Sequence, residues 1–342
     1  TSDLLYNKPV QATSGYTTIA SNIGVMENSG IEFSAFGKIF TKKFKWDFGG
    51  NISFVKNKVV SLIDNSNFLI VPSSGSNLYG GQMHALITGQ PVSTWFIYEQ
   101  TGIYQTDADV PTALFAKGVR AGDVIYRDVN KDGDITDADR LNVGKSIPDF
   151  YGGFTSNLSY GGFELSLFGQ FAVGNKVMAA WRGVNGTEGT DHLGNAFSNT
   201  RLLNGTTVEQ FFGIRKEVAL NYWNGPGTSN TTPRPVRRGV HTGYGSAGYN
   251  FLTSTRFLED ASYFKLKTVT LSYNIPTTTL KLKSIAGIRV FASVDNFITL
   301  TKYSGYDPEQ TFESSPGDSN YGVDFGLQAT LRTFLFGVNI KF

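Results

Sequence analysis

Strict alternation between apolar and polar side chains is the feature that most limits what this chain can fold into. In the clearest stretch, 44–54, even positions carry Phe, Trp, Phe, Gly, Ile and Phe, whereas odd positions carry Lys, Asp, Gly, Asn and Ser. Successive side chains of a β-strand point to opposite faces, so this stretch predicts a strand with one apolar and one polar face. Taken alone, such a strand also fits an antiparallel sheet that covers a soluble core.

A second pair of alternating stretches, 154–160 and 163–172, is joined by Gly161-Gly162, a sequence that favours a two-residue hairpin turn. Each stretch is about as long as the ~9–11 residues that a tilted strand needs to cross a bilayer. Barrels of about eight strands fill their lumen with side chains. Small polar residues on the polar side favour a wide, water-filled lumen with lipid on the apolar side. They are Thr155, Asn157, Ser159, Ser166, Thr268, Thr270, Ser272 and Ser293.

The lengths of the connections separate the membrane interpretation from the soluble one. We expect about eight crossing strands within 1–342: the opening stretch, two around Lys42, the Gly-Gly pair, and three near the C-terminus. Short turns alternate with long excursions near 59–147, 174–255 and 303–325. Transmembrane β-barrels have short turns on the periplasmic side and long loops outside. A soluble sandwich has no reason to sort its loops in this way, so the sequence favours an antiparallel transmembrane β-barrel.

The composition agrees with this fold class. The mean hydropathy of −0.16 is that of a soluble protein, but barrel proteins share this average because every second residue faces the lumen. The 39 glycines, 27 phenylalanines and 16 tyrosines favour many strands, turns and aromatic girdles. The net charge of +2, without a basic tail, implies no nucleic-acid partner. Thr1 lies inside a strand-like segment and no signal peptide opens the sequence, so we expect a targeting segment upstream.

An acidic stretch at 128–139, here called the Asp-rich loop, has the spacing of calcium ligands. The candidate ligands are Asp128, Asn130, Asp132, the backbone carbonyl of Asp134, and Asp139, with Thr136 acting directly or through water. Calcium takes six to eight oxygens, and Gly133 permits the sharp turn that wraps one loop around the ion. No helix pattern flanks the loop, so we expect a Ca²⁺-stapled loop rather than a sensor. The alternative is a solvated Asp-rich turn.

Other residues that could carry chemistry give weaker signals. The three histidines, His84, His192 and His241, lack paired spacing for zinc, and cysteine is absent. The glycines of a G-x-G-x-x-G match follow no clear strand, which argues against a nucleotide site. These glycines are Gly243, Gly245 and Gly248. An outer-membrane enzyme would need paired carboxylates, for which Glu164 and Asp295 are the candidates, and nothing in the sequence places them together.

Two clusters leave a choice between binding and structure. Arg234, Arg237 and Arg238 could hold an anionic ligand, although a solvated loop face is the favoured interpretation. Four aromatic residues gather in the first long excursion and could stack on a sugar or pack against the protein. They are Trp95, Phe96, Tyr98 and Tyr104. Packing is favoured because burial is the usual role of large rings.

Nine segments together resemble the C-terminal part of SusC/RagA-type TonB-dependent outer-membrane transporters of Bacteroidetes. They are NIGVMENSGIEFSAFGKIF with FKWDFGGNISFVKNKVVSL, TGIYQTDA, GDVIYRDVNKDGDITDADR with IPDFYGGFTSNLSYGGFELSLFGQF, ALNYWNGPG, FLEDASYFKLKTVTLSYNIP, IRVFASVDNFITLTKYSGYDPE, and TFLFGVNIKF. The resemblance spans nearly the whole chain in the expected order. The N-terminal plug and the earlier strands of that family are missing from the sequence.

The resemblance implies the last third of a plugged, 22-stranded barrel. It further implies a bacterial outer-membrane importer of oligosaccharides or peptides that makes and breaks no bonds. A SusD-like surface lipoprotein would cover the barrel, and TonB would act through the missing plug. The calcium-ligand roles carry over to the Asp-rich loop, whereas no substrate contacts do. The alternative is a complete, small, calcium-stapled outer-membrane barrel with a structural or adhesive role.

Overall fold

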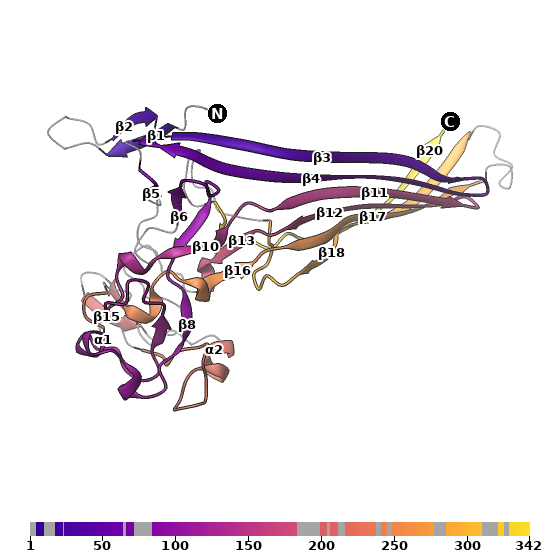
Figure 1. The fold of residues 1–342 in the computed structure, drawn as a ribbon. Helices are drawn as coiled ribbons and strands as arrows, with labels where there is room; N and C mark the ends of the chain where they lie inside the picture. The colour runs from indigo at the N-terminus through magenta and orange to yellow at the C-terminus, as the bar shows by residue number, and fades with distance from the viewer. Residues whose placement is uncertain are drawn as a thin grey trace.

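A computed structural model describes residues 5–9, 18–22, 24–63, 66–71, 84–182, 199–203, 206–210, 216–236, 241–244, 248–276, 285–309, 321–324 and 328–342. One long sheet dominates it, and smaller elements gather at one end of that sheet (Figure 1). Among the described residues, no helix combines the length and the apolar character needed to span a bilayer.

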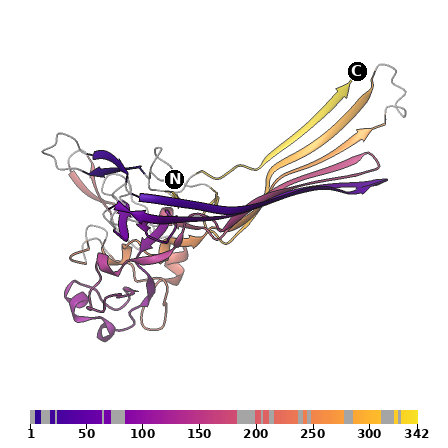
Figure 2. The ribbon, with the colours of Figure 1, turned by 45° about the horizontal axis from the view of Figure 1, so that its top comes forward.

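The long sheet contains seven strands in the order β3-β4-β11-β12-β17-β18-β20. Their bounds are β3 Gly24–Thr41, β4 Phe44–Leu62, β11 Phe150–Tyr160, β12 Phe163–Val173, β17 Tyr263–Ile275, β18 Gly287–Thr301 and β20 Thr333–Lys341. Every neighbouring pair is antiparallel and follows chain order, so the sheet is a meander. The strands twist and splay as they run away from the smaller elements (Figure 2).

The Gly-Gly hairpin forms as the sequence predicts. Gly161 and Gly162 join β11 to β12 with φ values of 58° and 90°. A type I′ turn needs positive φ at both central residues, which glycine adopts without steric cost. The eleven residues of each strand then pair without interruption, from Tyr160 with Phe163 to Phe150 with Val173.

The opening stretch differs from the expectation. We expect it to form a crossing strand, but its described part, β1 (Leu5–Pro9), pairs with β2 (Thr18–Asn22) in a separate two-stranded sheet. The long sheet therefore holds seven of the expected crossings among the described residues, and the opening stretch does not add an eighth.

The smaller elements form what we call the loop domain. Its strands are β5 (Phe68–Val71), β6 (His84–Ile87), β7 (Thr94–Ile97), β8 (Gln100–Ile103), β9 (Val124–Tyr126), β10 (Leu141–Lys145), β13 (Lys176–Ala179), β14 (Asn199–Leu203), β15 (Thr206–Gln210), β16 (Leu258–Asp260) and β19 (Val323–Asp324). Two short helices, α1 (Thr112–Ala116) and α2 (Lys216–Asn221), lie among them. Five 3₁₀ turns complete the domain: Asp107–Asp109, Asp137–Asp139, Ala180–Arg182, Tyr249–Phe251 and Thr255–Phe257.

Two apolar clusters hold the loop domain together. One surrounds Trp95, Ile97 and Phe257, and the other surrounds Tyr98 and Tyr126. Both draw on excursions that are more than a hundred residues apart in the sequence. The long loops of this chain are therefore a folded domain with its own core, placed at one end of the sheet.

Candidate functional site

The strands of the long sheet pair in a register that places their apolar side chains on one face across all seven strands. One cross-strand row of this apolar face consists of Phe40, Trp46, Leu158, Leu165, Leu271, Ala292 and Phe336. The adjacent row, on the polar face, consists of Lys38, Asp47, Asn157, Ser166, Thr270, Ser293 and Leu335. A shift of one residue in any strand would exchange these faces, so the pairing is strongly specified.

Within the described residues, the side chains of the apolar face are not buried in a protein core. Phe44, Phe48 and Ile340 are 40%, 38% and 49% exposed, and Phe336 is 75% exposed. A soluble sandwich would bury these side chains against a second layer. Such a broad, continuous apolar surface matches the lipid-facing side of a membrane barrel.

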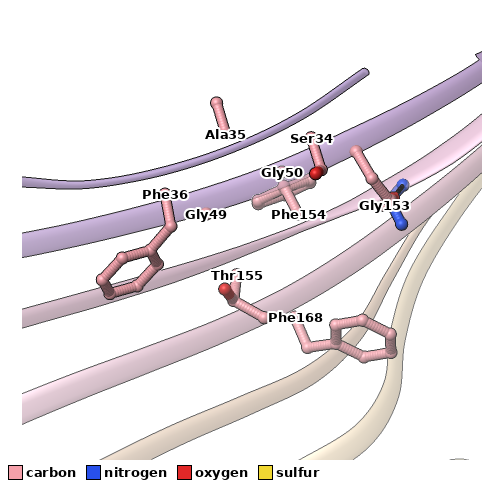
Figure 3. Close-up of a pocket in the computed structure, with 10 residues that line it drawn as sticks. Ser34, Ala35, Phe36, Gly49, Gly50, Gly153, Phe154, Thr155 and Phe168 are labelled. Atoms are coloured by element: carbon pink, nitrogen blue, oxygen red, sulfur yellow. Dashed lines mark hydrogen bonds between the residues drawn. The ribbon is translucent and has the colours of Figure 1, made fainter. Parts of the chain in front are cut away.

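Glycines hollow out part of the polar face. Gly49 and Gly153 form the floor of a cavity of about 380 Å³, and Phe36, Thr155 and Phe168 stand around it (Figure 3). A Cβ added at Gly49 would lie 3.1 Å from the Phe36 ring and 3.2 Å from Thr155 Oγ1. The lack of a side chain at Gly49 and Gly153 thus leaves a shallow hollow on this part of the polar face.

The two carboxylates considered for catalysis have separate structural partners. Glu164 forms an ion pair with Arg289 at 3.1 Å and accepts a hydrogen bond from Asn274 Nδ2 at 2.9 Å. Asp295 accepts a hydrogen bond from Thr268 Oγ1 at 3.0 Å. These contacts link neighbouring strands on the polar face, and they give no support to a paired-carboxylate active site.

A second ionic group ties the segment 303–309 to the polar face. The side chain of Lys265 is 4% exposed and binds the carboxylates of Asp307 and Glu309. Glu309 also accepts a hydrogen bond from Tyr263 Oη at 2.8 Å, and Thr330 binds Asp307. Burial alone would raise the pKa of Asp307, but the hydrogen bonds from Lys265 and Thr330 hold it below its ordinary value. The segment after β18 therefore folds inward over the sheet.

A buried aspartate organises the loop domain. Asp123 is fully buried and accepts two hydrogen bonds from Arg234, Nε to Oδ1 at 2.8 Å and Nη2 to Oδ2 at 3.0 Å. His241 Nε2 lies 2.9 Å from Oδ2, and Asn250 Nδ2 donates to Oδ1 at 2.8 Å. His241 Nδ1 accepts from the Tyr249 N–H at 3.2 Å, which fits the neutral ring with its proton on Nε2.

This group corrects the sequence-based interpretation of Arg234. Neither a solvated loop face nor an anionic ligand accounts for the side chain, because it is paired with Asp123 inside the domain. Arg237 and Arg238 lie outside the described residues. Burial would raise the pKa of Asp123, but hydrogen bonds from His241 and Arg234 outweigh it and lower that pKa.

The Asp-rich loop is curled by its own hydrogen bonds. Asp128 accepts from the N–H groups of Lys131 at 2.6 Å and Gly133 at 2.8 Å, and Asn130 and Asp132 make similar contacts within the loop. Gly133 has a φ of 80°, in agreement with its predicted role in the turn. In the part of the chain that the structure describes, no three acidic or histidine side chains gather closely enough to hold a metal ion.

The last two expected ligands have protein partners of their own. The Asp134 carboxylate binds Lys117 Nζ at 2.5 and 2.7 Å and Tyr244 Oη at 3.1 Å, which leaves its backbone carbonyl for the expected role. Asp139 is fully buried and accepts from the N–H groups of Val129 at 2.9 Å and Thr136 at 2.8 Å. Each carboxylate oxygen has a second lone pair, so these bonds do not exhaust its capacity.

The remaining candidates are structural. Trp95, Tyr98 and Tyr104 are buried in the two apolar clusters, and the partly exposed Phe96 ring packs on Phe68 with ring centroids 4.8 Å apart. The prediction that these rings pack rather than bind is confirmed.

Neither the histidines nor the glycine motif forms a site among the described residues. The His84 ring lies against the Trp95 ring with centroids 4.0 Å apart, whereas His241 binds Asp123, and His192 is not described. Gly243 and Gly248 have positive φ, and Gly245 is not described.

A meander of long antiparallel strands, apolar on one face and polar on the other, with folded loops at one end, defines the wall of a membrane β-barrel. The chain belongs to the SusC-type TonB-dependent receptors, as the comparisons with known proteins show. It is 30% identical over its whole length to TonB-dependent receptor P3 of Formosa agariphila and 25% identical to TonB-dependent receptor SusC of Bacteroides thetaiotaomicron. No family model matches the sequence.

Solved structures agree with the fold. The RagAB peptide transporter superposes with a TM-score of 0.68 at 19% identity, over 99% of this chain and 32% of that chain. The chain also spans only about a third of the length of the curated relatives, 31% and 29% of the two named above. It therefore matches one part of each of these longer proteins.

Proposed function

We propose that this chain forms part of the wall and the extracellular loops of a barrel in a bacterial outer membrane, and that the barrel imports a nutrient with energy from TonB. The observation that carries the proposal is the exposed apolar face, which is continuous across seven strands and is backed by a polar face. Names of the relatives add support, since they are TonB-dependent receptors and a peptide transporter. The residues of the chain would line a passage for the nutrient and would not catalyse a reaction.

The complete small-barrel alternative has less support. An eight-stranded barrel fills its lumen with side chains, whereas the polar face of the long sheet carries small side chains such as those of Ser166, Thr270 and Ser293. The relatives are also about three times as long as this chain. We therefore place the chain in the C-terminal portion of a 22-stranded, plugged barrel, with TonB acting on a plug segment outside this sequence.

A surface lipoprotein similar to SusD is the proposed partner. The folded loop domain, rather than a set of short turns, is the part of this chain that such a partner would contact on the cell surface. SusC and the RagAB assembly are the relatives that suggest it. Co-purification of the full-length protein from native outer membranes, followed by mass spectrometry, tests the partner directly.

Uptake tests the import function. Cells that carry the full-length protein should accumulate a labelled oligosaccharide or peptide, and deletion of TonB should abolish that accumulation. Phe336→Asp would place a charge on the apolar face and should reduce the amount of folded protein in the outer membrane, while Ser293→Asp, on the polar face, should not. Equal loss in both variants, or uptake that is independent of TonB, would reject the proposal.

We further propose that the Asp-rich loop binds Ca²⁺ as a structural staple. The donor set fits a hard cation: side-chain oxygens of Asp128, Asn130 and Asp132, the carbonyl of Asp134, and Asp139 on the buried side. The loop is already curled by backbone hydrogen bonds to Asp128. Calorimetry of the full-length protein with Ca²⁺ should detect one binding event that Asp128→Asn with Asp132→Asn abolishes. No calcium-dependent change in either protein would show a solvated turn instead.

A further inference from the structure

The segment 304–309, here called the gate segment, lies over the polar face of the long sheet and next to the loop domain. Two of its carboxylates reach β17, where Asp307 and Glu309 both bind Lys265 Nζ. Glu309 also accepts a hydrogen bond from Gln170 Nε2 on β12. The gate segment therefore spans two neighbouring strands on the side of the sheet that we assign to the passage.

A β-bulge adds a second cation to this contact. Lys267 has no partner in the register of β17 with β12 or with β18, because both pairings skip from Leu266 to Thr268. Its Nζ lies 3.2 Å from Glu309 Oε2. Bulges re-aim side chains and are frequent beside functional sites. Two lysines of β17 thus face two carboxylates of the gate segment, and we call this group the latch. Its members are Lys265, Lys267, Asp307 and Glu309.

Polar contacts hold most of the gate segment in place. Ser304 donates its N–H and its hydroxyl to the Glu259 carboxylate, both at 2.8 Å. Tyr306 is 76% exposed. Pro308 is the one buried apolar side chain of the segment, and it lines a cavity of about 770 Å³. A segment with few buried apolar contacts opens at a low cost in free energy, so the gate segment can move without unfolding the domain.

The residue before the gate segment is fixed. Tyr303 is 5% exposed and packs in an apolar cluster with Val177 and Ala179. Its hydroxyl donates to Asp324 Oδ2 at 2.6 Å. A Cβ at Gly305 would lie 2.4 Å from the Tyr303 ring, so glycine lets the chain pass close to this anchor. Movement of the gate segment would therefore pivot beside Tyr303.

The charges of the latch allow it to open. Its two ammonium groups and two carboxylates balance one another, and Lys265 and Asp307 are only 4% and 6% exposed beneath the gate segment. The attraction within a buried ion pair is largely offset by the hydration that its charges lose. When the gate segment lifts, all four groups would regain water. The closed and open positions therefore differ less in free energy than they would if an apolar contact held the segment.

We propose that the gate segment closes part of the passage beside β12 and β17, that the latch holds it there, and that it has to lift before a nutrient can pass. The proposal rests on the import function proposed above and adds a conformational step to it. Tyr303 supplies the fixed end of the moving segment, and Lys265 with Lys267 supplies the reversible contact at the other end.

Reversible cross-linking tests whether the gate segment has to move. Residues 1–342 contain no cysteine, so Gln170→Cys with Glu309→Cys places one reactive pair across the closed gate, in full-length protein without other cysteines. A reducible bis-methanethiosulfonate linker joins the pair. The probe is whichever of labelled maltohexaose, laminarihexaose or tryptic peptides the wild-type cells accumulate with TonB. Linked cells should accumulate it about tenfold more slowly, and a reducing agent should restore the rate.

Lys58→Cys with Glu27→Cys is the matched control. These residues also form an ion pair, at 3.2 Å, but they lie on β4 and β3, which are already paired at this position. Linking them should leave uptake unchanged. If the first pair does not assemble in the outer membrane, Asp307→Cys with Thr330→Cys joins the gate segment to the chain before β20 and decides the question. Uptake at the wild-type rate with the gate linked would overturn the proposal.

Hydrogen exchange tests the latch without transport. Lys265→Gln should speed exchange of residues 304–309 about tenfold, because the segment opens more often, and should leave residues 118–124 unchanged. Lys267→Gln removes the more exposed cation and should have a smaller effect in the same direction. This milder variant decides the question if Lys265→Gln does not fold. Exchange at the wild-type rate in both variants would show that the lysines do not hold the segment, and the latch would be rejected.

The two proposals fail in distinguishable ways. If the wild type accumulates none of the probes with TonB, the import function fails, and the gate fails with it. If the wild type imports a probe and the linked variant imports it equally fast, the import function stands and residues 304–309 are a fixed part of the wall.

Discussion

The indole N–H of Trp46 on β4 donates a hydrogen bond to Ser156 Oγ on β11, at 3.0 Å. Both residues lie on the apolar face of the long sheet, where Ser156 is the polar exception of its strand and is 7% exposed. In lipid an unpaired hydroxyl and an unpaired indole N–H would each be costly. The bond satisfies both across neighbouring strands and so allows a serine on a surface that we assign to the membrane.

Breaking this bond on one side should destabilise the barrel. Trp46→Phe keeps an aromatic ring but leaves Ser156 without its donor, at a cost of about 1 kcal/mol. The double variant Trp46→Phe with Ser156→Ala removes both polar groups and should recover part of that loss. Urea unfolding of the full-length protein from lipid vesicles measures the coupling as a double-mutant cycle. A coupling energy near zero would show that the bond is not formed in the membrane.

Neighbouring residues of β17 should respond oppositely to charge. Leu271 is on the apolar face and Thr270 is on the polar face, one residue earlier. An arginine on the lipid face of a barrel costs about 2–4 kcal/mol near the bilayer midplane. Leu271→Arg should therefore lose stability in vesicles, whereas Thr270→Arg should remain close to wild type. The reverse order of the two variants would mean that the faces are assigned the wrong way round.

The period-two pattern of the sequence explains what could be predicted and where prediction stopped. Alternation identified the strands around Lys42 and Gly161, because each strand has one apolar face. It missed the start of β3, which begins at Gly24. In that part of the strand, polar side chains of β3 and β4 bind one another: Asn57 Nδ2 donates to Asn28 Oδ1 at 2.6 Å, and Lys58 forms an ion pair with Glu27 at 3.2 Å. In this part β3 keeps its backbone pairing with β4, but its side chains no longer alternate between apolar and polar.

The candidate site was predicted less completely, for a related reason. Local spacing found the Asp-rich loop, because its residues are close in sequence. It could not pair Arg234 with Asp123, which are 111 residues apart. Those contacts depend on how separate excursions fold together, and a run such as RPVRRG looks solvated until its partner is known.

The stability of the loop domain should depend on the charge of Asp123. Its pKa is lowered in the folded protein by His241 and Arg234 despite burial. A carboxyl of this kind contributes stability above its unfolded pKa, about 3.9, and loses it as pH falls through the lower folded value. We therefore expect the domain to weaken below about pH 4. Hydrogen exchange at residues 118–124 and 248–252 reports this, and Asp123→Asn should remove the pH dependence.

A repeated tetrapeptide separates a structural role of Asp139 from a calcium-binding one. The sequence Thr-Asp-Ala-Asp occurs at 106–109 and at 136–139, and both copies form a 3₁₀ turn with a capping box. In each copy the last carboxylate accepts the threonine N–H, at 2.9 Å from Asp109 and at 2.8 Å from Asp139. Asn keeps an oxygen that can accept the threonine N–H but removes the negative charge, so each Asp→Asn substitution should cost on the order of 1 kcal/mol.

Asp139 alone belongs to the Asp-rich loop, so only Asp139→Asn should also weaken Ca²⁺ binding. Melting of the full-length protein in chelator should show a loss for both variants, larger for Asp139→Asn because Asp139 is buried and also accepts the Val129 N–H. In calcium, Asp109→Asn should keep the gain in melting temperature that the wild type shows, and Asp139→Asn should lose most of it. An equal calcium-dependent gain in the two variants would leave Asp139 with its capping role and remove it from the calcium site.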